Sequence, residues 1–63
     1  MMNIETASRE ELQVYKDYLH AELGQELTPT DLWSVGVSLA DYTAMREYMN
    51  RRLEAVNAQL LKV

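Results

Sequence analysis

The sequence predicts an all-α fold: an antiparallel helical hairpin with a short first helix and a long second helix. Three observations indicate this class. The second half carries an apolar repeat at heptad spacing, the first half carries a capped amphipathic stretch, and only a short segment separates the two. With 63 residues, the chain is long enough for one helical domain, which we assign to residues 1–63.

The first helix is expected at about residues 8–23. Ser8 is followed three residues later by Glu11, which is the signature of a capping box. Gly24 stands at the expected end of the helix, and residues 24–28 form the connection. The apolar positions of this stretch recur at helical spacing: Leu12, Tyr15, Leu19 and Leu23.

The second helix is expected at about residues 29–61. Thr28 can cap its first turn, and Pro29 suits its first position. The apolar stripe of this helix is spaced like the seam of a coiled coil. Only Arg46 interrupts the stripe. The residues of the stripe are Leu32, Val35, Leu39, Tyr42, Met49, Leu53, Val56 and Leu60, with Val63 after them.

Residues 36–38 are a weak point of the second helix. Glycine is unfavourable in the interior of a helix, and Gly36 stands there. Ser38, with Asp41 three residues later, can also be the N-cap of a new helix. A kink or a break is therefore open at this place. We favour continuity, because the apolar repeat keeps its phase through Gly36.

The lengths of the two helices predict a homodimer. At 1.5 Å per residue the first helix spans roughly 24 Å and the second roughly 48 Å, so about half of the stripe stays uncovered. We expect Leu53, Val56 and Leu60 to pair with a second copy in a helical bundle. The chain has no cysteine for a disulfide, and His20 is its only histidine, which makes a structural zinc ion improbable.

The charge of the chain is acidic and uneven. The net charge is −4, and residues 1–31 hold seven carboxylates against two basic side chains. This balance argues against general nucleic-acid binding, which needs a basic face. We find no signal peptide and no apolar run long enough to span a bilayer, so we expect a cytoplasmic protein.

No pattern in the sequence indicates catalysis. A phosphate-binding glycine loop, a nucleophile triad and metal-ligand spacing are all missing, and we expect neither a cofactor nor a metal. His20 is read as a solvated helical side chain. An enzyme is therefore the least favoured class.

Several large side chains beside the stripe are candidates for binding a protein partner. For each of them the alternative is a structural role. An aromatic or a methionine can pack in the core, which is the favoured interpretation of Trp33, and the Arg51–Arg52 spot can pair with Glu47 and Glu54. For Arg46 the choice is between a contact with a partner's carboxylate, a stem that covers apolar surface with its head in water, and a polar position that sets the register of an oligomer. Tryptophan, tyrosine and arginine are the residue types enriched at binding hot spots. The candidates are Tyr18, Trp33, Met45, Arg46, Tyr48 and Arg52.

The leading hypothesis for function is a small binding protein without chemistry of its own. Such a protein acts as an adaptor or inhibitor by laying a helical face on a larger protein. In size and acidity the chain resembles small helical proteins of phages and mobile elements, which would place it in the host cytoplasm.

Two further hypotheses stay open. The stretch from Asp41 to Glu54, with Met45, Tyr48 and Met49 ahead of Arg52, resembles the C-terminal helix of small phage head–tail joining proteins. That resemblance implies a structural role and a strand signal at residues 33–37. The other hypothesis is a nucleic-acid-binding helical hairpin, which the acidic charge opposes.

Overall fold

The computed structural model describes residues 2–63 and shows three helices: α1 (Arg9–Leu23), α2 (Pro29–Ser34) and α3 (Leu39–Leu60). These residues form no β-strand, which confirms the all-α class. The strand signal expected at residues 33–37 under the head–tail hypothesis is absent, because this segment is the end of α2 and a turn.

Helix α1 begins and ends within one residue of the expected range. The Ser8 side chain accepts a hydrogen bond from the Glu11 amide at 3.1 Å, and the Glu11 carboxylate accepts one from the Ser8 amide at 3.1 Å. Both halves of the capping box are thus formed. At the other end the Gly24 amide donates to the His20 carbonyl, and the helix stops there.

The continuity that we favoured for residues 29–61 is wrong, because the chain breaks between α2 and α3. Gly36 has a φ of 75°, a left-handed conformation that ends a helix. The Ser38 side chain then accepts from the Asp41 amide at 3.1 Å and starts α3. The alternative in which Ser38 is the N-cap of a new helix is therefore the one that the structure adopts, although the apolar repeat keeps its phase through the break.

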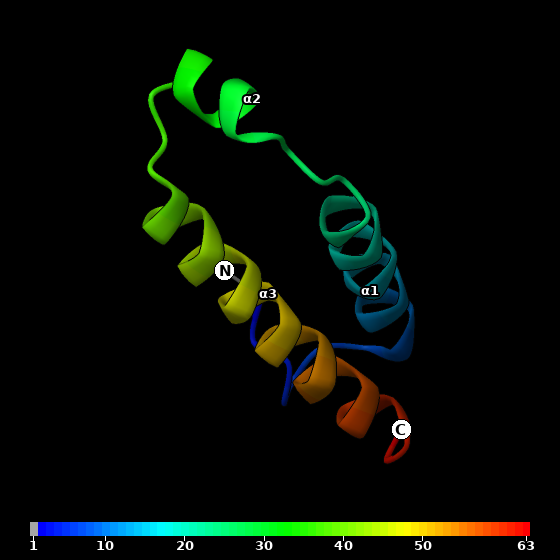
Figure 1. Cartoon of the computed structure of the whole chain (residues 1–63). Coiled ribbons are helices and arrows are strands. Elements are labelled where there is room, and N and C mark those ends of the chain that lie inside the picture. Colours follow the sequence, from blue (N-terminus) through cyan, green and yellow to red (C-terminus); the bar gives the residue numbers. More distant parts are fainter. Residues whose placement is uncertain (1) are drawn as a thin grey trace.

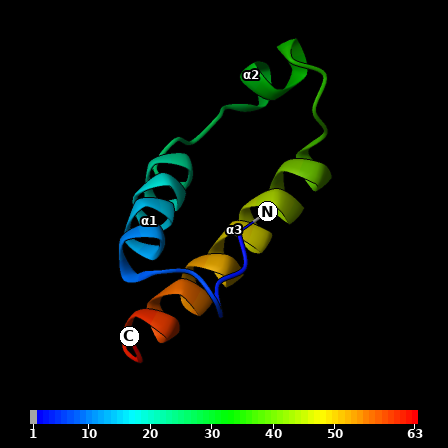
Figure 2. The same cartoon turned by 180° about the vertical axis from the view of Figure 1, so that it is seen from behind.

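Helices α1 and α3 lie side by side and run in opposite directions (Figures 1 and 2). Three contacts fix their register. The Arg9 side chain reaches the Leu60 carbonyl, Arg52 contacts Tyr15, and Arg46 reaches the Leu23 carbonyl. Helix α1 therefore covers α3 from residue 46 to residue 60. A third helix separates the two in the chain, where we had predicted a single short connection.

The core lies between α1, the second half of α3 and the segment that precedes α1. Its buried side chains are Ile4, Leu12, Leu19 and Val56, and Leu53 and Leu60 pack against them. The prediction that the stripe around Leu53, Val56 and Leu60 stays open is therefore wrong. The extra length of the α2 segment lets α1 reach this far end of α3, so the uncovered part of the stripe lies at the opposite end, before residue 46.

The molecule is elongated, with extents of 41 × 17 × 16 Å. Its radius of gyration is 13.7 Å, whereas a compact domain of this length is expected near about 11 Å. Helix α2 forms one end of the long axis, and the C-terminus lies at the other (Figure 1). The features that follow are concentrated at the α2 end.

Candidate functional site

Three large apolar side chains are exposed in and just after α2. Trp33 is 84% exposed, and Val35 and Leu39 are each 66% exposed. We call this surface, formed by Trp33, Val35 and Leu39, the apolar tip. A large apolar side chain that is as exposed as Trp33 is a candidate anchor for the binding of another molecule.

Helix α2 is short, but both of its ends are fixed by hydrogen bonds. At its start the Thr28 side chain accepts from the Asp31 amide at 3.2 Å, and the Asp31 carboxylate accepts from the Thr28 amide at 3.1 Å. At its end the amides of Gly36 and Val37 donate to the carbonyls of Trp33 and Leu32. This pair of bonds is a Schellman motif. The apolar tip is therefore presented by an ordered segment.

The charges around the tip are of one sign. Residues 17–45 contain five carboxylates and no lysine or arginine. Within the described part of the chain only one ion pair is formed, between Arg51 and Glu47 at 3.7 Å, and it lies outside this range. Basic side chains stand at both ends of this range, Lys16 and Arg46, so the segment that carries the apolar tip has an excess of negative charge.

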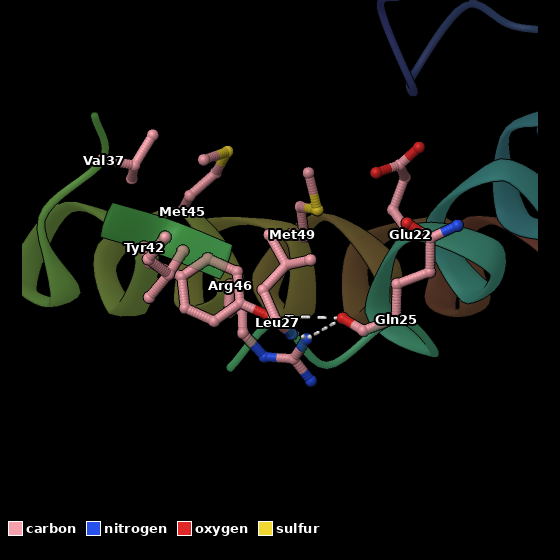
Figure 3. A pocket seen from close by; sticks show the side chains of 9 residues that line it. Glu22, Gln25, Leu27, Val37, Tyr42, Met45, Arg46 and Met49 are labelled. Carbon is pink, nitrogen blue, oxygen red and sulfur yellow. Dashed lines mark hydrogen bonds between the residues drawn. The ribbon is translucent and has the colours of Figure 1, made fainter. Parts of the chain in front are cut away.

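A pocket of about 130 Å³ lies beneath α2, where the end of α1 and the start of α3 meet it (Figure 3). We call it the α2 pocket. In Figure 3 the side chains of Val37, Met45, Met49 and Glu22 point to one side of it, and Tyr42 and Leu27 lie below them. The lining consists of Glu22, Gln25, Leu27, Leu32, Val37, Tyr42, Met45, Arg46 and Met49.

Arg46 and Tyr42 hold the connection between α1 and α2 in place. The Arg46 guanidinium donates to the carbonyls of Leu23 at 3.0 Å and Gln25 at 3.1 Å. The Tyr42 hydroxyl donates to the Gln25 carbonyl at 3.2 Å and accepts from the Leu27 amide at 3.1 Å. Arg46 thereby satisfies the Leu23 carbonyl, which has no helical partner at the end of α1, and both side chains bond to backbone groups of the connection that follows.

Arg52 plays a similar part at the middle of the α1–α3 contact. Its guanidinium donates to the Tyr15 hydroxyl at 3.0 Å and to the Met2 carbonyl at 2.8 Å. It also lies over the Tyr15 ring, 5.4 Å from the ring centre. Tyr15 in turn stacks with Tyr18, and their ring centres are 6.3 Å apart. Arg52 thereby ties the segment before α1 to both long helices.

The structure divides the six candidates for partner binding into three groups. Trp33 belongs to the apolar tip, and Met45 lines the α2 pocket. Arg46 and Arg52 bond to groups elsewhere in the chain, and neither forms one of the local glutamate pairs or the solvated head that the sequence suggested. Tyr18 and Tyr48 are about half exposed on α1 and α3. The hypothesised contact between Arg46 and a partner carboxylate has no support in this arrangement.

The residues predicted for the stripe also separate. Leu32 and Val56 are buried, whereas Val35 and Leu39 are exposed because the break at Gly36 turns them away from the core. The remaining members of the stripe are half-buried: Tyr42, Met49, Leu53 and Leu60.

Sequence reasoning missed the pocket residues Glu22, Leu27 and Val37. A signal for two of them was present. Leu27 and Leu32 stand immediately before the cap and at the fourth helical position, the places of a hydrophobic staple. Val37 follows the left-handed Gly36, where a Schellman motif has its apolar contact. Glu22 had no comparable signal, since its place depends on how α1 and α3 pack.

No group of three or more His, Asp or Glu side chains gathers within residues 2–63 as a metal site would need. Nor does any helix of that range combine the length and apolar character required to cross a bilayer. No protein family, curated protein or solved structure matches the chain.

Proposed function

We propose that this chain is a non-enzymatic interaction module that binds a larger protein through the apolar tip. The observation that carries the proposal is Trp33, which is 84% exposed on a helix fixed at both ends. A tryptophan of this kind is the commonest type of binding hot spot. Burying 150–250 Å² of its surface corresponds to about 4–6 kcal/mol of transfer free energy, before the cost of association.

The charge around the tip indicates the chemistry of the partner. Because five carboxylates and no cation occupy residues 17–45, a complementary surface is an apolar groove rimmed by lysine and arginine. Binding of that kind supports a role as an adaptor or as an inhibitor that covers the partner's groove. The opposite charge makes the association faster at low salt.

A homodimer is the competing arrangement for the same surface. The predicted dimer seam around Val56 is covered within the chain, so the dimer that competes for this surface is one in which a second copy meets the first at the tip. Two tips would bring their carboxylates together, and like charges oppose that contact. We therefore place a basic partner ahead of self-association.

The proposal is tested with Trp33→Ser and a matched control, Val14→Ser, which alters an exposed apolar residue on α1. Wild-type protein and both variants are immobilised, and bound proteins from the source cells are compared. A protein retained by wild type and Val14→Ser but not by Trp33→Ser is then purified for calorimetry. We expect Trp33→Ser to weaken its binding at least about 30-fold, the size of a hot-spot effect.

Two results would contradict the proposal. One is binding of the purified partner by Trp33→Ser as tightly as by wild type. The other is a dimer that light scattering detects at all concentrations and that Trp33→Ser dissolves, because the second copy would then occupy the tip.

A further inference from the structure

The α2 pocket has the size of one side chain. Its volume is about 130 Å³. A dry protein cavity of about 150 Å³ takes a benzene molecule, whereas pockets for cofactors and drug-sized ligands measure about 300–1,000 Å³. The α2 pocket is therefore too small for a cofactor and large enough for a single aliphatic group.

The chemistry of the walls selects an apolar group. Leu32, Val37, Met45 and Met49 supply most of the surface around it, and methionines adapt to the shape of what they contact. The polar groups on the opposite wall, on Tyr42 and Arg46, already bond to backbone atoms of residues 23–27. The polar groups of Tyr42 and Arg46 therefore need no hydrogen-bond partner from a guest, and an aliphatic chain can lie against this wall.

Two charged side chains line the pocket, Glu22 and Arg46, and neither forms an ion pair within residues 2–63. The Arg46 guanidinium is bonded to the carbonyls of Leu23 and Gln25, which leaves the Glu22 carboxylate as the charged group at the open edge. Its side chain is exposed and points to the same side as Met45 and Met49 (Figure 3). A cation placed beside a guest in the pocket would therefore meet a carboxylate.

We propose that the α2 pocket receives one branched aliphatic side chain of the protein partner, next to a basic residue that pairs with Glu22. This inference rests on the proposed function and makes it more specific. The partner then carries an aliphatic residue with a neighbouring lysine or arginine, which enters the pocket while the apolar tip lies in the partner's groove. The cavity volume, its apolar walls and the unpaired carboxylate each support one part of this assignment.

The test uses three small probes that share an isopentyl group: isopentylamine, isopentanol and isocaproate. They carry a positive, a neutral and a negative end. Methionine methyl groups labelled with carbon-13 report on binding by NMR, because Met45 and Met49 line the pocket and Met2 packs in the distant core. Ligands of this size are expected to bind with dissociation constants on the order of 1–10 mM.

We expect saturable shifts of the Met45 and Met49 signals with little change at Met2. The amine should bind about twofold to fivefold more tightly than the alcohol, the range of an exposed ion pair, and the carboxylate should bind most weakly. Glu22→Gln should remove the preference for the amine and leave the affinity for the alcohol unchanged. Leu27→Phe, which fills the pocket, should weaken all three.

Three outcomes would overturn the inference. They are the absence of saturable shifts at Met45 and Met49, equal shifts at Met2, and a carboxylate that binds as well as the amine. If Leu27→Phe does not fold, Glu22→Gln still tests the inference. The Glu22 side chain is exposed, so this substitution should not disturb the fold. Trp33→Ser should leave probe binding unchanged, so failure of the pocket and failure of the tip are seen separately.

Discussion

The hydrogen bonds of Arg46 could not be predicted from its position in the apolar repeat. It lies on the apolar stripe of α3, yet its guanidinium bonds to the carbonyls of Leu23 and Gln25, more than twenty residues away in the chain. The arginine therefore completes the end of α1 from another helix. Its stem covers apolar surface, and its head supplies donors that the end of a helix lacks.

Arg46→Met should lower the free energy of unfolding by about 2 kcal/mol. The variant keeps the apolar stem but removes hydrogen bonds from a charged donor, which contribute about 1.5–3 kcal/mol. Urea denaturation followed by circular dichroism measures the change. The control is Arg51→Met on the same helix, whose exposed pair with Glu47 should account for less than about 0.5 kcal/mol. Equal losses in both variants would contradict the role of Arg46.

The capping box of α1 makes part of the protein's stability depend on pH. The Ser8 backbone amide and then the Ser8 side chain donate to Glu11 and hold the pKa of that carboxyl below its ordinary value of 4.5. Because the folded pKa is the lower one, this stabilisation is complete above about pH 4.5. It is lost as the pH falls through the folded value.

Ser8→Ala should raise the pKa of Glu11 part of the way to its ordinary value, since the backbone donor remains. A carboxyl-carbon NMR titration of Glu11 measures the shift. Glu10, the neighbouring carboxylate in the first turn, serves as the internal reference. An unchanged titration of Glu11 in this variant would show that the Ser8 hydroxyl does not act on it.

At the scale of the elements, the break between α2 and α3 decides where the exposed surface lies. Gly36 has a left-handed backbone, and a Cβ there would meet nothing within 4 Å. The penalty of a substitution is therefore one of backbone conformation alone.

Gly36→Ala should consequently destabilise the protein by about 1–2 kcal/mol, whereas alanine would stabilise a continuous helix at this position. Thermal unfolding monitored by circular dichroism shows whether Gly36→Ala raises or lowers the stability of the protein. Gly36→Asn should lose less, because asparagine tolerates the left-handed region better. A stabilised alanine variant would mean that residues 29–60 form one helix in solution.

The two ends of α1 could be predicted from the sequence because the signals that set them are local. These are Ser8 with Glu11 at one end and Gly24 at the other. The start of α3 at Ser38 was visible too, but the repeat kept its phase through Gly36 and favoured the wrong alternative. That phase is a property of spacing in the sequence. It carries no information once Gly36 changes the direction of the chain, and Val35 and Leu39 are exposed as a result.

The candidate site was predictable only in part for the same reason. Trp33 was recognised as lying next to the stripe, but the interpretation we favoured, a core position where two helices cross, is wrong because the side chain is 84% exposed. The α2 pocket depends on the register of α1 against α3, which long-range contacts such as Arg46 to Leu23 determine. No local pattern encodes a contact of that range.

At the scale of the whole molecule, stability depends on a very small core. Among residues 2–63 the buried apolar side chains are Ile4, Leu12, Leu19, Leu32 and Val56. A domain of this length is expected to have about 3–9 kcal/mol of total stability. One cavity in such a core therefore removes a large share of it.

Leu12→Ala should cost about 3 kcal/mol and leave a large unfolded fraction at body temperature. The control is Val14→Ala on the same helix, where the exposed side chain should matter by less than about 0.5 kcal/mol. Circular dichroism over a temperature ramp compares the two. A Leu12→Ala variant as stable as wild type would mean that the packing of α1 on α3 contributes little.

Trp33 is also the only tryptophan of the chain, and it is surrounded by water in the folded protein. Its fluorescence emission should therefore stay nearly constant when the protein unfolds, so it makes a poor optical probe of folding. The same property makes it a sensitive probe of docking, because a blue shift and protection from acrylamide quenching would arise when another molecule covers the indole ring. Because this single tryptophan lies at the end of the molecule where a partner is expected, selective excitation of the indole can follow association without a dye.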